Sequence, residues 1–290
     1  MAITTDQVTS VKAKGFLRNR GTDKFSGRVV GKGGVFTAEQ LSAIAECARL
    51  YGDGTAIMTS RLCIELTGIP FENIEPASAF ITEKTGLSFG GTGAKVRPIT
   101  ACKGTTCVFG NIDTRSLAAE IHDRYYVGMS DMKLPHKFKI GVGGCPNSCM
   151  KPSLNDFGIE GVRLVEYDMD KCRGCKVCQI AKACPMKTCQ VVDGKLSVGE
   201  ECSKCGVCVG KCPFGAVKPT AESAYRVYVG GTWGKHTRMG TRLDRLFSRE
   251  EVLELIGRTM EWFAANGQPK ERLSAVLDRV GVDEYLKAVL

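Results

Sequence analysis

The segment GVGGCPNSCMKP, residues 141–152, places Cys145 and Cys149 four residues apart on a turn rich in glycine and proline. A second pair, Cys102 and Cys107, precedes it by about forty residues. Pairs so distant converge only through the fold, so each must lie on its own loop beside a common cavity. Glycines next to both pairs let the backbone approach a bulky cofactor closely. We therefore expect one four-cysteine site made from two loops.

Eight further cysteines form two runs typical of a two-cluster ferredoxin. The run at 202–213, CSKCGVCVGKCP, reproduces the C-x2-C-x2-C-x3-C-P arrangement, whose fourth cysteine ligates the other cluster of the pair. The run at 172–178, CRGCKVC, is followed by Cys184-Pro185 after five residues instead of three. Crossed ligation predicts one cluster on Cys172, Cys175, Cys178 and Cys212, and another on Cys202, Cys205, Cys208 and Cys184.

Disulfides and zinc are the alternatives to clusters. The N-terminal sequence MAITTDQVTSVKAKG has no apolar signal region, so we expect a cytoplasmic, reducing location in which disulfides are disfavoured. Zinc typically uses pairs of C-x2-C, whereas both runs contain three cysteines in C-x2-C-x2-C. The remaining cysteines, Cys47, Cys63 and Cys189, have no such spacing, and we interpret them as small hydrophobic residues.

Composition is that of a globular protein with room for a substantial core and a small additional module. The chain has 290 residues, 43% of them apolar and 24% charged. The formal charge of +9 comes from scattered residues without a Lys/Arg run, so nucleic acid is not indicated. Each four-thiolate cubane carries roughly −2, so anionic cofactors offer a better account of the basicity. No segment is long and apolar enough to predict a membrane span.

Strands are expected at 24–36, 54–68, 136–143, 158–167 and 225–230, and helices at 74–85, 113–126 and 249–265. Thr37 with Gln40, and Ser248 with Glu251, have the spacing of capping boxes at helix starts. A final helical pair follows Pro269. The cysteine-dense segment 169–219 interrupts this pattern, which predicts an insertion into a host domain.

The cysteine motifs resemble those of the sulfite and nitrite reductase family, whose hallmark is a cubane bridged to sirohaem. GCPNSC is similar to the family's C-x3-C signature. The resemblance implies that Cys149 ligates both the cluster and the sirohaem iron. Within the family, the chain resembles the C-subunit type of anaerobic sulfite reductase, which has a ferredoxin pair inserted after this motif. The first pair departs from the commonest family spacing, being C-x4-C instead of C-x5-C.

Four cations extend the resemblance to substrate binding. Arg28 in RVVGKGGVFTAEQL, Arg61 in MTSRLCIEL, and Lys137 and Lys139 in LPHKFK are similar to the residues with which the family binds its anion. Strand alternation is expected to direct these side chains to one face. Solvated surface charge is the alternative for such residues. Three further residues near the cysteines are candidates for binding the sirohaem carboxylates: Arg97, Lys103 and Asn147.

The resemblance implies an α+β fold: a sirohaem/[4Fe-4S] nitrite–sulfite reductase half-unit with an inserted two-cluster ferredoxin domain. The expected division is a ferredoxin-like, substrate-cation half-domain at 1–96, a sirohaem and [4Fe-4S] domain at 97–168 plus 220–290, and the inserted domain at 169–219. Larger family members contain two related halves that meet across sirohaem, whereas one half-unit is recognisable here. We therefore expect a homo- or hetero-oligomer.

The expected activity is six-electron reduction of sulfite to sulfide, with sirohaem and three [4Fe-4S] clusters as cofactors. Reduction of nitrite to ammonia on the same site is an alternative. An iron–sulfur electron carrier, or a sirohaem-binding protein without turnover, is another. The sequence has no flavin or nicotinamide motif, so we expect electrons to come from a separate reductase protein or a ferredoxin.

Overall fold

The computed structural model describes residues 3–290, which form two compact units. Unit 1 comprises Met1–Thr100, Arg115–Ile140 and Gly257–Leu290, and unit 2 comprises Ala101–Thr114 and Gly141–Ile256. Residues 1 and 2, part of the expected first domain, lie outside the described residues. The expected domain division at 96, 168 and 219 differs from these unit boundaries and stays a prediction.

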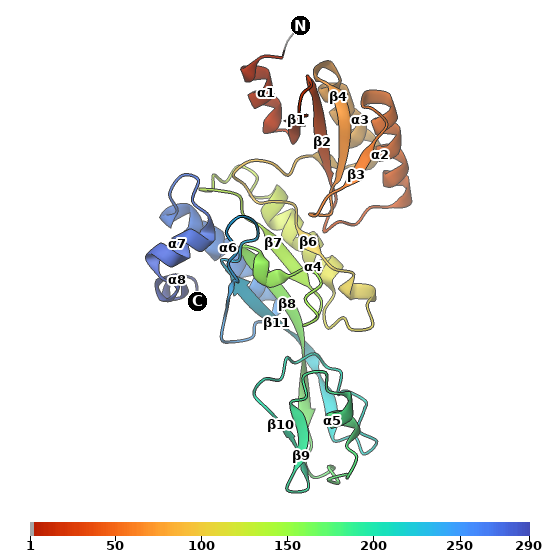
Figure 1. Ribbon diagram of the computed structural model, residues 1–290, viewed down its shortest axis with the longest axis vertical. Helices are drawn as coiled ribbons and strands as arrows, with labels where there is room; N and C mark the ends of the chain where they lie inside the picture. Colours follow the sequence, from red (N-terminus) through yellow and green to blue (C-terminus); the bar gives the residue numbers. More distant parts are fainter. Residues whose placement is uncertain (1–2) are drawn as a thin grey trace. The chain divides into compact units, whose positions relative to one another are not determined.

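Unit 1 is built on an antiparallel sheet packed against two helices (Figure 1). The strand order is β1-β2-β4-β3, and β5 also pairs with β2. The strands are β1 (Phe16–Arg18), β2 (Lys24–Val30), β3 (Ala56–Met58), β4 (Ile64–Pro70) and β5 (Ser88–Phe89). The helices are α1 (Thr5–Lys12), α2 (Ala38–Tyr51) and α3 (Ile74–Thr85), with a 3-10 turn at Phe71–Asn73.

Local sequence explains how β2 leads into α2. The strand ends in a glycine turn, where Gly33 and Gly34 have φ values of 62° and 82° that favour glycine. The predicted capping box is confirmed: Thr37 Oγ1 accepts a hydrogen bond from the Gln40 N–H, and the Gln40 side chain accepts one from the Thr37 N–H. One face of α2 and α3 then buries residues such as Ile44 and Ile81 against the sheet.

The prediction of one strand at 54–68 is wrong. The segment forms β3 and β4, joined by a turn in which the Leu62 N–H donates to the Thr59 carbonyl at 3.0 Å. Leu62 has a φ of 57°, which ends the extended backbone without glycine or proline. Arg61 therefore lies in a turn, and strand alternation does not set its direction.

The remaining predicted helices are confirmed. Helix α4 (Thr114–Ile121) continues into a π-helical stretch at His122–Val127. Helix α6 (Arg249–Asn266) begins with the expected capping box, in which the Glu251 N–H donates to Ser248 Oγ at 3.2 Å. Helices α7 (Leu273–Val280) and α8 (Val282–Val289) form the final pair.

Unit 2 contains most of a second sheet, with strand order β12-β11-β8-β7-β6. Its strands are β6 (Thr100–Ala101), β7 (Ile140–Gly143), β8 (Phe157–Tyr167), β11 (Val217–Val229) and β12 (Thr241–Arg242). Two predicted boundaries are wrong. Residues 136–139 form no strand apart from an isolated bridge at Phe138, and the strand expected at 225–230 already begins at Val217, because it pairs with β8 along its length.

The cysteine-dense segment connects β8 to β11 in the chain and lies at one end of this strand pair (Figure 1). It contains α5 (Gln179–Ala183) and a hairpin of β9 (Cys189–Val192) and β10 (Lys195–Val198). Ile180, Leu196 and Val217 form its small core together with Cys184 and Cys189. That this insertion holds two clusters stays a prediction. Among the described residues, no helix has the length and apolarity needed to cross a bilayer.

Candidate functional site

Unit 1 contains a cavity of about 280 Å³ lined by all four predicted substrate cations. The cations come from separate segments, and Arg97 lines the same cavity. The lining residues are Arg28, Thr59, Ser60, Arg61, Cys63, Gly91, Arg97, Pro98, Lys137 and Lys139. We call this the cation pocket.

Two arginines of the cation pocket are held by fixed partners. Arg28 on β2 lies opposite Glu65 on β4, and its Nε donates to Glu65 Oε2 at 2.5 Å. The Arg61 guanidinium donates to the Pro98 carbonyl at 2.6 and 3.0 Å and to the Ile140 carbonyl at 2.9 Å. Backbone carbonyls thus fix Arg61 without neutralising its charge.

The two lysines lie either side of Phe138, which is fully buried. The backbone at Phe138 pairs with the neighbouring segment that contains Lys95 and Arg97. The Phe138 N–H donates to the Lys95 carbonyl, and the Arg97 N–H donates to the Phe138 carbonyl. Residues two apart on extended backbone share a face, which explains why both lysines reach the cation pocket.

Arg97 provides an unsatisfied donor in this pocket. Its Nη1 donates to the Gly91 carbonyl, but its buried Nε has no hydrogen-bond partner within residues 3–290. Burial, together with the charge of Arg28, lowers the pKa of Arg97 from its usual value. A buried donor without a partner is costly, so an anion entering here would remove a penalty as well as gain attraction.

His136 adjoins Lys137 in the chain but does not line the cation pocket. Its Nδ1 accepts a hydrogen bond from the Lys137 N–H at 2.8 Å. Burial and the neighbouring Lys137, Arg272 and Arg97 charges lower the pKa of His136 from its usual value of 6.5. The protons and charge of the cation pocket therefore come from arginine and lysine.

Unit 2 brings together the four cysteines of the two loops, which we call the CPNSC group: Cys102, Cys107, Cys145 and Cys149. Cys102 Sγ accepts a hydrogen bond from the Gly144 N–H at 3.1 Å, which ties one loop to the other. Burial raises the pKa of the Cys145 thiol, and the sulfurs of Cys102, Cys149 and Cys107 are close enough to raise it further.

Glycine is required where the two loops meet. A Cβ on Gly144 would lie 2.8 Å from the Gly104 Cα and 3.3 Å from Cys102 Sγ. The first loop makes a 3-10 turn at Gly104–Thr106, and Thr114 Oγ1 donates to the Cys102 carbonyl at 2.7 Å. The short C-x4-C loop thus still forms a defined turn that presents both cysteines.

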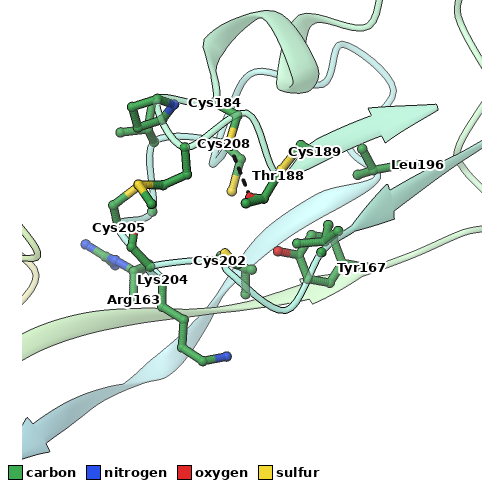
Figure 2. A pocket seen from close by; sticks show the side chains of 18 of the residues that line it. Arg163, Tyr167, Cys184, Thr188, Cys189, Leu196, Cys202, Lys204, Cys205 and Cys208 are labelled. Atoms are coloured by element: carbon green, nitrogen blue, oxygen red, sulfur yellow. Dashed lines mark hydrogen bonds between the residues drawn. The ribbon is translucent and has the colours of Figure 1, made fainter. Parts of the chain in front are cut away.

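The other eight cysteines line two cavities in the predicted crossed grouping. The inner group lines a cavity of about 590 Å³ and comprises Cys184, Cys202, Cys205 and Cys208 (Figure 2). The outer group lines a cavity of about 270 Å³ and comprises Cys172, Cys175, Cys178 and Cys212. Leu196 lines both cavities. Their role as cluster ligands stays a prediction, because grouping alone does not show bound iron.

Cys189 also lines the inner cavity, although its spacing in the sequence predicts only a small hydrophobic residue. Figure 2 shows it beside Cys184 and Thr188. Burial opposes ionisation of Cys184, but hydrogen bonds from Thr188 and Cys189 lower its pKa to about 6. These donors favour a thiolate at this position, which is the form that binds iron.

The inner group and the CPNSC group share a cavity wall. Cys145 and Cys205 both line a space of about 310 Å³, together with Phe109, Asn147, Ala183, Pro185 and Val207. No outer-group cysteine lines this space, and no CPNSC-group cysteine lines the outer cavity. This arrangement is the basis of the names inner and outer.

A buried ion pair that sequence reasoning missed connects these loops. Arg226 Nη1 on β11 donates to Glu160 Oε1 on β8 at 2.5 Å. Ser148 of the CPNSC turn donates to Glu160 Oε2 at 2.7 Å, and Arg226 Nη2 donates to the Ser203 carbonyl at 3.3 Å. The available signal was a glutamate inside the apolar strand sequence GIEGV.

The three candidates for sirohaem carboxylate contacts are divided between the two units. Arg97 lines the cation pocket of unit 1, whereas Lys103 and Asn147 are exposed residues on the two CPNSC-group loops of unit 2. Within residues 3–290, no set of three or more His, Cys, Asp or Glu side chains is arranged to bind a single metal ion.

Comparison with known proteins assigns the fold and the site to a family. The family model described as "Nitrite/Sulfite reductase ferredoxin-like half domain" matches residues 18–84. The model described as "Nitrite and sulphite reductase 4Fe-4S domain" matches residues 92–290. The chain belongs to the nitrite and sulphite reductase family. The resemblance inferred from its motifs and the expected half-unit fold are therefore confirmed.

Two curated relatives are both named as sulfite reductases. The chain is 33% identical over 260 residues to coenzyme F420-dependent sulfite reductase of Methanocaldococcus jannaschii, covering 89% of this chain and 40% of that protein. It is 30% identical over 247 residues to the anaerobic sulfite reductase C-subunit of Salmonella typhimurium, covering 77% and 69%. The chain thus spans only 40% of the length of the first relative.

Solved structures agree on the fold. The crystal structure of dissimilatory sulfite reductase I superposes with a TM-score of 0.74 at 24% identity, covering 92% of this chain and 69% of that one. Mycobacterium tuberculosis NirA gives a TM-score of 0.68 at 17% identity, covering 99% and 48%.

The residues present suit the cofactors of this family. The CPNSC group supplies four cysteines from two adjoining loops, which is the donor set of a [4Fe-4S] cluster. The cation pocket, with its unsatisfied Arg97 Nε, suits carboxylate or oxyanion groups. Family membership and this donor chemistry support iron–sulfur and sirohaem binding.

Replacing Gly144 with alanine tests the contact between the two loops. We predict that Gly144→Ala loses about four irons per chain, because its Cβ would lie 2.8 Å from the Gly104 backbone. The matched control is Gly143→Ala, whose Cβ meets its nearest atom at an ordinary 3.5 Å. Anaerobic iron and acid-labile sulfide determination measures both; equal contents in the two variants would contradict the prediction.

Proposed function

We propose that the chain is the sirohaem-dependent catalytic subunit of a sulfite reductase, reducing sulfite to sulfide. The observation that supports this most strongly is the cation pocket, where five cations from four segments line one cavity. A volume of about 280 Å³ lies just below the range of about 300–1,000 Å³ typical of pockets for drug-sized ligands, so it suits a small oxyanion.

The reaction consumes six electrons and seven protons: sulfite, as SO3²⁻, becomes HS⁻ and three water molecules. The pocket cations would hold the substrate oxygens throughout. Arginine remains protonated and lysine nearly so at neutral pH, and a close ion pair is worth about 4 kcal/mol at 4 Å and an effective dielectric of 20, before desolvation costs. Lys137 and Lys139 can also donate protons as oxygen leaves as water, which arginine does less readily.

The CPNSC group would hold the cluster next to sirohaem, with Cys149 shared between cluster and sirohaem iron, as the family resemblance implies. Bound there, sirohaem and the cluster would supply the electron transfer and the bond cleavage. Arg97, Lys103 and Asn147 are the proposed contacts for the sirohaem carboxylates. Arg97 is the strongest of the three, because its Nε has no hydrogen-bond partner among the described residues.

Electrons would reach the site through two further [4Fe-4S] clusters, one on the outer group and one on the inner group. The shared cavity wall of Cys145 and Cys205 supports the order from outer to inner to CPNSC group. We propose three clusters and one sirohaem per chain, supplied with electrons by a ferredoxin or a separate reductase protein.

We further propose that the reaction centre is shared between chains. The family's larger members combine two related halves, and this chain matches one half domain and one 4Fe-4S domain. A second copy, or another subunit, would supply the missing half.

Nitrite is the rival substrate, and an electron carrier without turnover is the rival class. A relative named nitrite reductase, from Bacillus subtilis, is 23% identical over 259 residues. The retained cations favour turnover over simple electron transfer, because a carrier has no need of an anion pocket. Comparing kcat/KM for sulfite and nitrite on the same preparation decides between the two substrates.

Replacing both pocket lysines with methionine tests the substrate role. We predict that Lys137→Met with Lys139→Met lowers kcat for sulfide production about 10²–10³-fold while the sirohaem absorption spectrum stays unchanged. The matched control replaces two exposed lysines outside the cation pocket, Lys95→Met with Lys133→Met, and should retain activity. Turnover by the pocket variant equal to that of the control would contradict the proposed role.

A complementation experiment tests the shared reaction centre. One chain carries Lys137→Met with Lys139→Met, and the other carries Cys149→Ser; each is inactive alone. In a homodimer whose sites combine cations of one copy with cysteines of the other, random mixing restores about a quarter of wild-type activity, because half the dimers are mixed and each has one complete site. Sulfide assays after co-expression measure this, and no recovery would contradict a shared centre between copies.

A further inference from the structure

The cations next to the outer group form an exposed surface that the reaction site does not use. Residues 169–219 contain nine Lys and Arg and four Asp and Glu, a net charge of +5. The cations that directly adjoin outer-group cysteines in the chain are Lys171, Arg173, Lys176 and Lys211, all exposed, and no acidic residue adjoins these cysteines. At the inner group, Glu201 and Lys204 offset each other.

Three of these cations have no acidic partner. Lys171 pairs with Asp168 at 2.5 Å, but Arg173, Lys176 and Lys211 make no ion pair among residues 3–290. Lys195 adds positive charge close by, since its Nζ donates to the Met169 and Cys172 carbonyls at 2.7 and 3.1 Å. Cations therefore outnumber acidic residues among the immediate chain neighbours of the outer-group cysteines.

Apolar side chains accompany these charges. Val177 is 67% exposed and Phe214 is 48% exposed, and both line the outer cavity with the four cysteines and Arg173. Exposed apolar contacts beside a charged rim are the composition of a protein–protein interface. We call the surface formed by Lys171, Arg173, Lys176, Val177, Lys211 and Phe214 the outer face.

The outer face is also well placed within unit 2. Figure 1 shows α5, β9 and β10 at the end of the β8–β11 pair remote from β6 and β7.

We propose that the outer face is the docking surface for a small acidic one-electron carrier protein. This rests on the proposed function only in assuming that the outer group holds a redox cluster. One electron passes from the reduced carrier to the outer cluster, and no bond forms or breaks. Complementary charge would steer the encounter and orient the carrier, whereas the apolar contacts would exclude water at the point of transfer.

The test measures reduction of the anaerobic oxidised holoprotein by stopped-flow absorbance, in the absence of sulfite. The probe is an acidic plant-type [2Fe-2S] ferredoxin in its reduced form. We expect the second-order rate constant to fall about tenfold between about 0.05 and 0.5 M salt, because screening shortens the range of charge attraction. A rate independent of salt would overturn the proposal.

Charge-reversal variants test whether the carrier docks on the outer face. Lys176→Glu with Lys211→Glu should lower the rate with ferredoxin about tenfold at low salt. The control, Lys182→Glu with Lys187→Glu, changes the net charge of the same segment equally but adjoins no outer-group cysteine, and should stay within about twofold of wild type. Equal losses in the two variants, or no loss in either, would overturn the proposal.

Reduced methyl viologen, a small cation, separates docking from altered cluster potential. Its rate should not fall in Lys176→Glu with Lys211→Glu, because the added negative charge attracts it. A fall with both donors would indicate a changed potential and overturn the proposal. Sulfide production driven by methyl viologen is then assayed separately: its absence in the wild type would contradict the proposed function while leaving the docking result intact.

Discussion

The buried Glu160–Arg226 pair is the interaction on which the cysteine sites of unit 2 depend. Each member binds its partner strand and one cysteine loop: Glu160 accepts from Ser148 between Cys145 and Cys149, and Arg226 donates to the Ser203 carbonyl. The side chains are only 3% and 11% exposed. Removing one partner of such a pair typically costs about 3–5 kcal/mol, because the other charge stays buried. The pair thus fixes the CPNSC turn and the inner-group loop to the same two strands.

The cation pocket and the CPNSC group are held in different ways, the first through charged side chains and the second through close backbone contact. The cation pocket gathers side chains from distant segments: backbone carbonyls hold Arg61, and the Glu65 carboxylate holds Arg28. The CPNSC group instead depends on backbone approach, where Gly104 and Gly144 let two loops come together. An anion site needs fixed positive charge, whereas a cluster site needs fixed sulfur positions.

Features encoded by short spacing could be predicted from sequence, and those that depend on distant partners could not. Capping boxes and the individual cysteine and family motifs rest on residues within a few positions of one another, whereas the crossed cysteine grouping follows from the general pattern of the C-x2-C-x2-C-x3-C-P run. The turn at Arg61 was missed, because Leu62 adopts a φ of 57° in a segment rich in apolar and β-branched residues without a central glycine or proline. Gathering of the four cations was expected from motif resemblance, but the carbonyls that hold Arg61 lie 37 and 79 residues away. The contact of Cys189 with the inner cavity likewise appears only when β9 and β10 pair.

The central claim is that one chain combines an anion pocket with a cluster-linked tetrapyrrole site and two further clusters. The most direct measurement is the iron, acid-labile sulfide and tetrapyrrole content of the anaerobically purified protein, with its absorption spectrum. The account predicts sirohaem bands, about thirteen irons and about twelve sulfides per chain. About eight irons without a tetrapyrrole would contradict it and leave a chain that only carries electrons.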